Sequence, residues 1–311
     1  MPPSKRPSIR VVCQEYVPLV DDPLTKNWNR DGQIIKFRLP PFAIAQGQRA
    51  STERAMTQML ERYHILLLSE LQCGQDDIIR QTLTEANRHM HESSMISGAL
   101  SICIITRLLC KSFNLSGTES LEVSDVDDPT SPYYGRKPIP PLLDAQIDEI
   151  WMEKLAKIRK KVLGDLKKHV LERTKTRSNW YLIFLTVFLL LLNLEFLYQN
   201  QNRQLERYCE AHPRQSYHFS VLQMMDGWSH AAQNILAHFH NICRGQFGLL
   251  QDWTDKQVQL DAAVDDQAVI FLQCLQNTVE AREPELRELS RKLPGTPLVW
   301  ISSMFVVESE E

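Results

Sequence analysis

The feature that most constrains the fold of this chain is a leucine-rich run near its middle. Residues 180–192 read WYLIFLTVFLLLL, and the apolar character continues to Tyr198. At about 1.5 Å per residue, a helix over 180–198 would be roughly 28 Å long, which is nearly the thickness of a bilayer core. A helix that is apolar on all sides must be surrounded either by protein or by lipid.

The residues within and beside the run leave both environments open. Asn193 and Glu195 oppose membrane insertion, but both lie near one end of the run, where a polar residue costs less than at its centre. Three basic residues closely precede the run, as they would on the cytoplasmic side of a single span. The residues therefore predict either a buried helix of a large α-helical domain or a membrane anchor at 180–198.

Apolar residues elsewhere in the chain also recur at helical spacing. From Ile147 to Val170 they step by three or four over more than six turns, which predicts a long amphipathic helix. The structure of the apolar segment 298–307 stays open. The expected fold class is all-α, a helical bundle-like region. Helices are expected over 51–74, 78–91, 94–109, 147–170, 180–210, 221–239 and 255–282.

Prolines and charges predict four parts along the chain. Residues 1–50 hold seven of the sixteen prolines and one short β-like stretch, at 34–39, so we expect an irregular, Pro-rich N-terminal arm. A helical subdomain over 51–111 follows. Residues 112–141 carry five acidic residues and no Lys or Arg before their first proline, which indicates an extended, solvated linker. The main helical domain is expected over 142–307.

No catalytic or metal-binding motif stands out. The chain has no G-x-S-x-G, Walker A, G-x-G-x-x-G or H-E-x-x-H pattern. Its seven cysteines form no C-x-x-C pair, and Cys103 and Cys110 are expected to be buried thiols on one face of an apolar helix. His230 and His238 lie two turns apart on one helical face and could share a ligand, although we do not expect a metal. We expect neither an enzyme nor a resident cofactor, and we predict no catalytic or cofactor-binding residues.

The net charge of −3 conceals a segregated distribution. Residues 151–177 carry ten Lys and Arg and three acidic residues, so this segment carries +7 and leaves −10 for the remainder. The exposed face of the long helix should therefore be basic. It could bind phosphate, acidic lipid or a nuclear import receptor, or it could be a solvated helix face. The candidate residues for an anionic partner or for nuclear import are Lys157, Arg159, Lys160, Lys161, Lys167 and Lys168.

Three stretches of the sequence together resemble one protein family. They are IIKFRLPP at residues 34–41, YYGRKPIPP at 133–141 running into DAQID at 144–148, and NLEFLYQNQ at 193–201 with Gln204. Several later residues fall in a matching order. From about residue 10 to 305, the chain resembles the C-terminal regulatory region of fungal zinc-cluster transcription factors. The later matching residues are Trp228, Asn234, His238, Phe239, Trp253 and Leu260.

The resemblance implies an α-helical regulatory or effector module of a nuclear transcription regulator, which acts through protein contacts with the transcription machinery. It also implies that the leucine-rich helix belongs to a soluble helical region. The alternative remains a single-pass membrane protein, located in the membrane rather than in the nucleus. Members of the family bind DNA through an N-terminal six-cysteine zinc cluster. Here Cys13 stands alone near the start and the other cysteines are scattered, so zinc and direct DNA contact are expected only if an upstream cluster exists.

Overall fold

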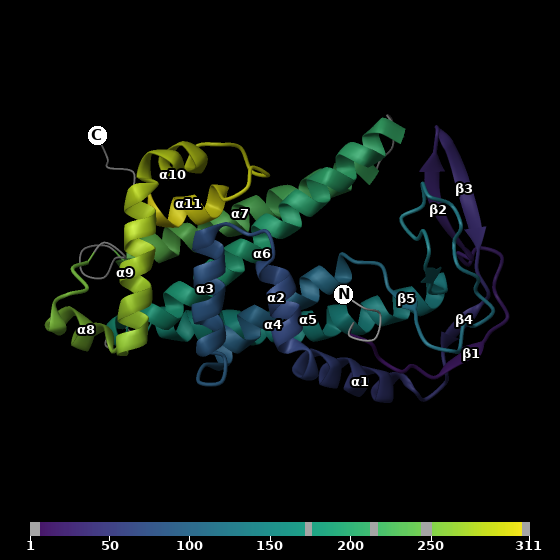
Figure 1. Cartoon of the computed structure of the whole chain (residues 1–311), viewed down its shortest axis with the longest axis horizontal. Helices are drawn as coiled ribbons and strands as arrows, with labels where there is room; N and C mark the ends of the chain where they lie inside the picture. Colours follow the sequence, from purple (N-terminus) through teal and green to yellow (C-terminus); the bar gives the residue numbers. More distant parts are fainter. Residues whose placement is uncertain (1–6, 172–175, 212–216, 244–250, 307–311) are drawn as a thin grey trace. The chain divides into compact units, whose positions relative to one another are not determined.

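The computed structural model describes residues 7–171, 176–211, 217–243 and 251–306, and these residues are mostly helical. Figure 1 follows the chain through its helices and short strands. The chain divides into two compact units, each made from two separate stretches of sequence. Unit 1 comprises Met1–Leu71 and Arg107–Leu155, and unit 2 comprises Gln72–Thr106 and Ala156–Glu311.

The N-terminal part of unit 1 contains paired strands where the sequence predicts an irregular arm. β2 (Thr25–Arg30) and β3 (Gln33–Arg38) form an antiparallel hairpin, which confirms the β-like stretch expected at 34–39. Its two-residue turn has positive φ at both Asp31 and Gly32, the geometry that suits the twist of a hairpin. β1 (Cys13–Glu15) pairs with β4 (Phe42–Ile44). The fold is therefore mostly helical rather than all-α. The sequence does not predict most of these strands, because strands of three to six residues give only a weak periodic signal.

The acidic segment of unit 1 is partly buried, which corrects the expectation that it is a solvated linker. β5 (Asn114–Leu115) pairs with β6 (Lys137–Pro138), and Val123 and Val126 are buried. Nε1 of Trp28 donates a hydrogen bond to Oδ2 of Asp128 at 2.8 Å, which ties the segment to the β2–β3 hairpin. A single buried valine between charged residues is too short a pattern for sequence reasoning to detect.

Helices complete both units. The helix expected over 51–74 is divided at Tyr63 into α1 (Arg49–Arg62) and α2 (His64–Gln72). α3 (Asp77–Arg88), α4 (Ser94–Leu109) and α5 (Pro141–Leu171) confirm the expected helices there, and α5 contributes residues to both units.

The C-terminal part of unit 2 differs from the expected pattern in one place. The single helix predicted over 255–282 is divided into α8 (Lys256–Ala262) and α9 (Asp266–Ala281), because Ala263 adopts the left-handed conformation and Asp265 caps α9. α7 (Tyr217–Cys243) confirms the expected helix. α10 (Glu283–Ser290) and α11 (Val299–Phe305) follow. Most of the segment left open at 298–307 is therefore a short helix, and its residue 307 lies outside the described residues.

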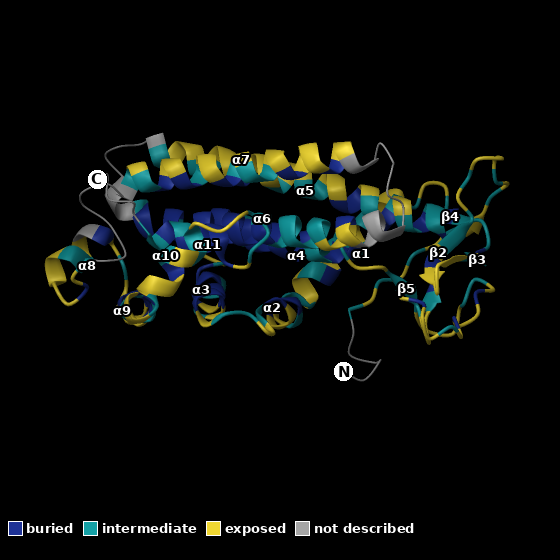
Figure 2. Cartoon of the chain, turned by 90° about the horizontal axis from the view of Figure 1, so that it is seen from above, coloured by how far each residue is buried: buried dark blue, intermediate teal, exposed yellow. Residues whose placement is uncertain are grey.

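α6 (Thr176–Ala211) is the core helix of unit 2 and contains the leucine-rich run. Figure 2 shows the middle of α6 as buried. Phe184, Leu185 and Phe188 are completely buried, and the Phe184 ring lies 6.3 Å from that of Phe239 in α7. The helix is long and apolar enough to cross a membrane, but 78% of its most apolar window is buried inside the protein. The run is therefore surrounded by protein, and the membrane alternative is not favoured.

Candidate functional site

The six basic residues that the sequence singles out all lie exposed on α5, in the part of the helix that belongs to unit 2. At about 100° per residue, five of them fall within an arc of about 120° along roughly 16 Å of the helix axis. Arg159 lies outside this arc. We call the five residues within it the lysine face: Lys157, Lys160, Lys161, Lys167 and Lys168.

The opposite side of α5 holds the lysine face in position. Val162 is 1% exposed and projects about 160° away from the centre of the lysine face. It packs against Gly98 of α4, where a Cβ atom would overlap Cγ2 of Val162 and lie 3.5 Å from Cγ2 of Ile158. Because Gly98 lacks that atom, the side chains of α5 reach the backbone of α4. This contact turns the five lysines outward into solvent.

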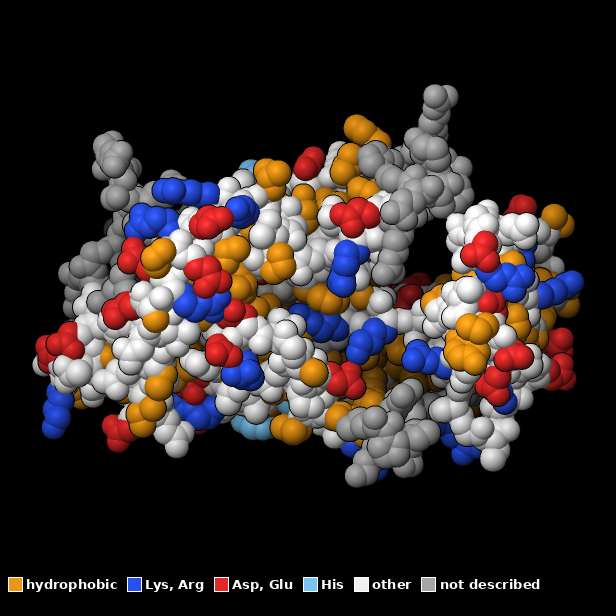
Figure 3. Space-filling model, turned by 45° about the horizontal axis from the view of Figure 1, so that its top comes forward, with side chains coloured by type: hydrophobic (Ala, Val, Ile, Leu, Met, Phe, Trp, Pro, Cys, Tyr) orange, Lys and Arg blue, Asp and Glu red, His pale blue; other side chains and the backbone are white. Residues whose placement is uncertain are grey.

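The lysine face is poorly neutralised by the rest of the described chain. Nζ of Lys168 lies 3.7 Å from Oδ1 of Asp165, and no other carboxylate of the described residues lies within 4.0 Å of the five ammonium groups. Elsewhere in unit 2, Arg88 and Arg282 each contact two carboxylates at 2.9 Å or less. On the surface seen in Figure 3, basic and acidic side chains are interspersed. The lysine face differs from that pattern because nearly all of its charge lacks a carboxylate partner within the part of the chain that the structure describes.

A glycine occupies the middle of the lysine face. Gly164 lies in the interior of α5, its φ is not positive, and no atom lies within 4 Å of where its Cβ would be. Glycine in a helix interior costs about 1 kcal/mol relative to alanine. Neither packing nor backbone conformation within the described chain requires this glycine. It leaves the helix backbone accessible between two pairs of lysines.

A buried polar network connects α3 to α6. Oε1 of Glu85 accepts hydrogen bonds from Nη2 of Arg88 at 2.6 Å and from the hydroxyl of Tyr181. His89 approaches the same oxygen at 3.2 Å. Burial alone would raise the pKa of Glu85, but hydrogen bonds from His89, Arg88 and Tyr181 lower it to about 2. Arg88 also reaches Asp265, so the network joins α3, α6 and the start of α9. Sequence reasoning misses it because Glu85 and Tyr181 are far apart in the chain.

A second buried carboxylate joins α6 to α11. Glu195 is 4% exposed, and its two oxygens accept hydrogen bonds from the backbone N–H groups of Leu298, Trp300 and Ile301 at 2.6–3.1 Å. Burial raises the pKa of Glu195 to about 7, against the opposing effect of these three donors. The carboxylate thus satisfies backbone donors at the start of α11 that have no partner within that helix. Both networks join helices of unit 2 through hydrogen bonds.

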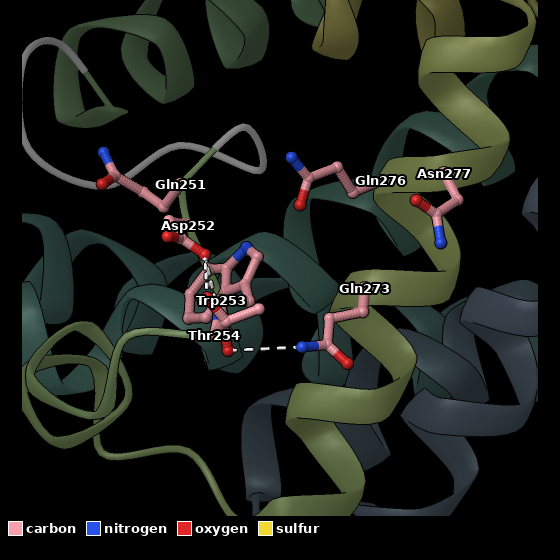
Figure 4. A pocket seen from close by; sticks show the side chains of 7 residues that line it. All are labelled: Gln251, Asp252, Trp253, Thr254, Gln273, Gln276 and Asn277. Carbon is pink, nitrogen blue, oxygen red and sulfur yellow. Dashed lines mark hydrogen bonds between the residues drawn. The ribbon is translucent and has the colours of Figure 1, made fainter.

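A pocket of about 450 Å³ lies beside α9. Figure 4 shows carboxamide side chains around it, together with Asp252, Trp253 and Thr254. Asp252 already accepts hydrogen bonds from the backbone and hydroxyl of Thr254, which lower its pKa. Nε2 of Gln273 donates to the Trp253 carbonyl at 3.4 Å. The contact between Thr254 and Asp252 is a local turn contact two residues apart, and the lining holds no pair of carboxylates.

The remaining candidates for metal binding lie apart from one another. His230 and His238 are exposed on α7, and the described residues contain no group of three or more His, Cys, Asp or Glu that could hold a metal. Cys103 is buried and its Sγ donates to the Leu189 carbonyl at 3.3 Å, as expected for a structural thiol. Cys110 is only half-buried, which differs from the expectation of full burial. The lysine face is therefore the described surface with the clearest chemical character.

Comparison with known proteins matches the chain to transcription factors. The profile of the KpeA transcription factor family matches residues 3–303. The satratoxin biosynthesis SC3 cluster transcription factor SAT20 of Stachybotrys chartarum is 26% identical over 293 residues, which is 93% of this chain and 41% of that protein. The chain thus spans about two fifths of the length of this relative. No solved structure matches the chain.

Proposed function

Because the chain belongs to the KpeA transcription factor family, we propose that it is the regulatory module of a transcription factor and acts through protein contacts on its helical surfaces. The family match over residues 3–303 is the observation that carries this proposal. The match covers nearly the whole chain, so we attribute the regulatory role to the helical fold as a whole rather than to a short motif. Membership of a transcription factor family implies a regulator rather than an enzyme.

We also propose that sequence-specific DNA recognition is supplied by a zinc cluster that lies outside these 311 residues. The relative from Stachybotrys chartarum is more than twice as long as this chain, which leaves room for such a domain. The cysteines of this chain lack the repeated C-x-x-C pairs that a six-cysteine zinc cluster needs. Zinc would then be a cofactor of that domain, and this module would contact DNA-bound partners of the transcription machinery.

A tethering assay tests the regulatory role directly. The chain is fused to a heterologous DNA-binding domain and expressed with a reporter that carries the cognate sites. We expect the reporter output to rise or fall relative to the DNA-binding domain alone. A well-folded fusion that leaves the output unchanged would contradict the proposal.

Localisation tests the same proposal in a second way. A fluorescently tagged chain should be found in the nucleus, and exclusion that persists after a zinc cluster is attached would argue against a transcriptional role. Carbonate extraction separates this location from the membrane alternative. Because α6 is buried inside unit 2, we expect the chain in the supernatant, and retention in the pellet would revive the anchor at 180–198.

A further inference from the structure

We propose that the lysine face of α5 binds the phosphate backbone of double-stranded DNA without reading its sequence. This inference rests on the proposed regulatory function, which would bring the module close to DNA in the full-length factor. It assigns to the chain a direct contact with nucleic acid that is additional to recognition by a zinc cluster.

The first step of the argument is the unpaired charge. Lys157, Lys160, Lys161 and Lys167 have no carboxylate partner among the described residues, and Lys168 has only the contact to Asp165 at 3.7 Å. The chain as a whole is slightly acidic, with a net charge of −3. Cations that are concentrated on one face of such a protein produce a local positive potential that attracts polyanions.

The second step is the dimension of the face. The five lysines span roughly 16 Å along α5. One strand of B-DNA presents a phosphate about every 3.4 Å along the duplex axis, so a stretch of this length contains about five phosphates. Because that strand also winds through nearly half a turn over this length, a straight helix meets only some of its phosphates. With the lysine face over a groove, the flexible stems can reach phosphates of both strands.

The third step is the rigidity of the basic segment, which favours duplex DNA over an import receptor. Such a receptor would bind the basic residues as an extended peptide. The segment is a continuous helix, and Val162 is buried against Gly98 of α4. Unwinding it would expose this packing to water. A ligand must therefore recognise the helical array as it stands, and a duplex is itself a rigid array of charges.

The fourth step is the choice of lysine, which indicates backbone contact rather than base reading. Reading a mixed sequence in the major groove uses Arg or Lys on guanine together with the amides of Asn and Gln on adenine, and the lysine face carries no amide side chain. Lys is a point charge on a flexible stem and suits individual phosphates. The one arginine of the cluster, Arg159, lies outside the lysine face. The lysine face is therefore suited to binding phosphate charge and not to reading base sequence.

Gly164 adds an observation that points the same way. It lies between Lys160 and Lys161 on one side and Lys167 and Lys168 on the other, and the space above it is open. A phosphate held by these lysines can approach the helix backbone closely only where no side chain projects. A membrane surface fits less well, because a helix that lies in a membrane must expose an apolar side. In this segment Val162 is buried, and Leu163 is the one large apolar side chain that is exposed between Lys157 and Lys168.

The experiment measures binding of the whole chain to a fluorescently labelled 20-base-pair duplex of arbitrary sequence, by fluorescence anisotropy at 50 to 200 mM NaCl. The test variant carries Lys160→Gln, Lys161→Gln and Lys167→Gln. The control carries the same three-charge change at exposed lysines outside the face. Its substitutions are Lys36→Gln, Lys256→Gln and Lys292→Gln.

A second pair of variants introduces a negative charge at an open helical glycine. Gly164→Glu places a carboxylate in the middle of the lysine face. Gly227→Glu makes the same change at an exposed position of α7 that also has no neighbouring atom within 4 Å. Circular dichroism establishes that each variant is folded before binding is measured.

We expect a slope of log Kd against log salt of about 4.5 for the wild type, if all five lysines meet phosphates, and about 2 for the test triple. The test triple and Gly164→Glu should each raise Kd about tenfold or more at 50 mM NaCl, whereas both controls should remain within about twofold of the wild type. Equal weakening in test and control variants would overturn the proposal, because it would show that only the total charge matters.

Two further outcomes would also overturn it. One is a wild-type chain that binds no duplex, and the other is a face that binds vesicles containing phosphatidylserine but not the duplex. Each of these results can be distinguished from failure of the proposed function. The tethering assay supplies its own DNA-binding domain, so its reporter output should be the same for the test triple and the wild type.

Discussion

The buried carboxylate of Glu195 should make the stability of this protein depend on pH in a direction opposite to that of a typical acidic residue. Glu195 lies in α6, 4% exposed, and accepts three hydrogen bonds from the start of α11. The informative perturbation is Glu195→Gln. It retains the shape of the side chain and one acceptor oxygen, but it removes the ionisation.

The magnitude follows from the shift in pKa. The pKa of Glu195 is about 7 in the folded protein, because burial penalises the charged form, against 4.5 as the ordinary value. The folded state therefore holds a proton more tightly than the unfolded state, and stability falls as pH rises through this window. The stabilisation that the folded state gains from the proton on Glu195 is fully present below pH 4.5 and is lost by about pH 7. At about 1.4 kcal/mol per pKa unit, the wild type should lose 2–3 kcal/mol between pH 5 and pH 8 through this group.

The assay is urea-induced unfolding of wild type and variant at pH 5 and pH 8. Other groups titrate in the same range, so the quantity of interest is the difference in unfolding free energy between the two proteins. That difference should shift by about 2–3 kcal/mol in favour of Glu195→Gln at the higher pH. Glu206→Gln, at an exposed position of the same helix, is the matched control and should show no comparable shift.

One result would refute this reasoning. If the wild type instead gains stability relative to Glu195→Gln as pH rises, then the folded state does not hold the extra proton that burial implies. A difference that stays constant between pH 5 and pH 8 would equally contradict it, since it would show that Glu195 has the same protonation state at both values.

Three further substitutions test the packing and charge described above, each by urea unfolding. Gly98→Ala should lower the free energy of unfolding by about 1–3 kcal/mol, because its Cβ would overlap Val162. Adding Val162→Ala should recover part of that loss, and a double variant whose loss equals the sum of the two single losses would contradict the contact. Gly164→Ala should stabilise the protein by about 1 kcal/mol, since no packing requires glycine there, and a loss of stability would show otherwise. Glu85→Gln should lower the free energy of unfolding by about 2–3 kcal/mol near neutral pH, because Arg88 and Tyr181 lose a charged acceptor. This loss should shrink as pH falls from 4.5 towards 2, and a loss independent of pH would count against the low pKa of Glu85.

Much of the helical architecture can be predicted from the sequence, because amphipathic periodicity is local. The predicted helix at 94–109 has the bounds of α4, and the seven-residue apolar stripe from Ile147 to Val170 lies within α5. Sequence reasoning misses the helix breaks at Tyr63 and at 263–265, where the backbone leaves the helical conformation over one and three residues without Gly or Pro. The lysine face is predictable as a basic cluster for the same reason as the helices, although its function stays a prediction.

The sequence by itself determined that residues 180–198 form a helix apolar on every side, and that a basic helix precedes it. Only the tertiary structure decided what surrounds the apolar helix, because protein and lipid satisfy the same hydrophobicity. It placed Phe184 against α7 and gave Glu195 its donors from α11. It also selected the lysines that face solvent, through the burial of Val162 on α4. These outcomes depend on contacts between residues far apart in the chain, and such contacts leave no periodic trace in a single sequence.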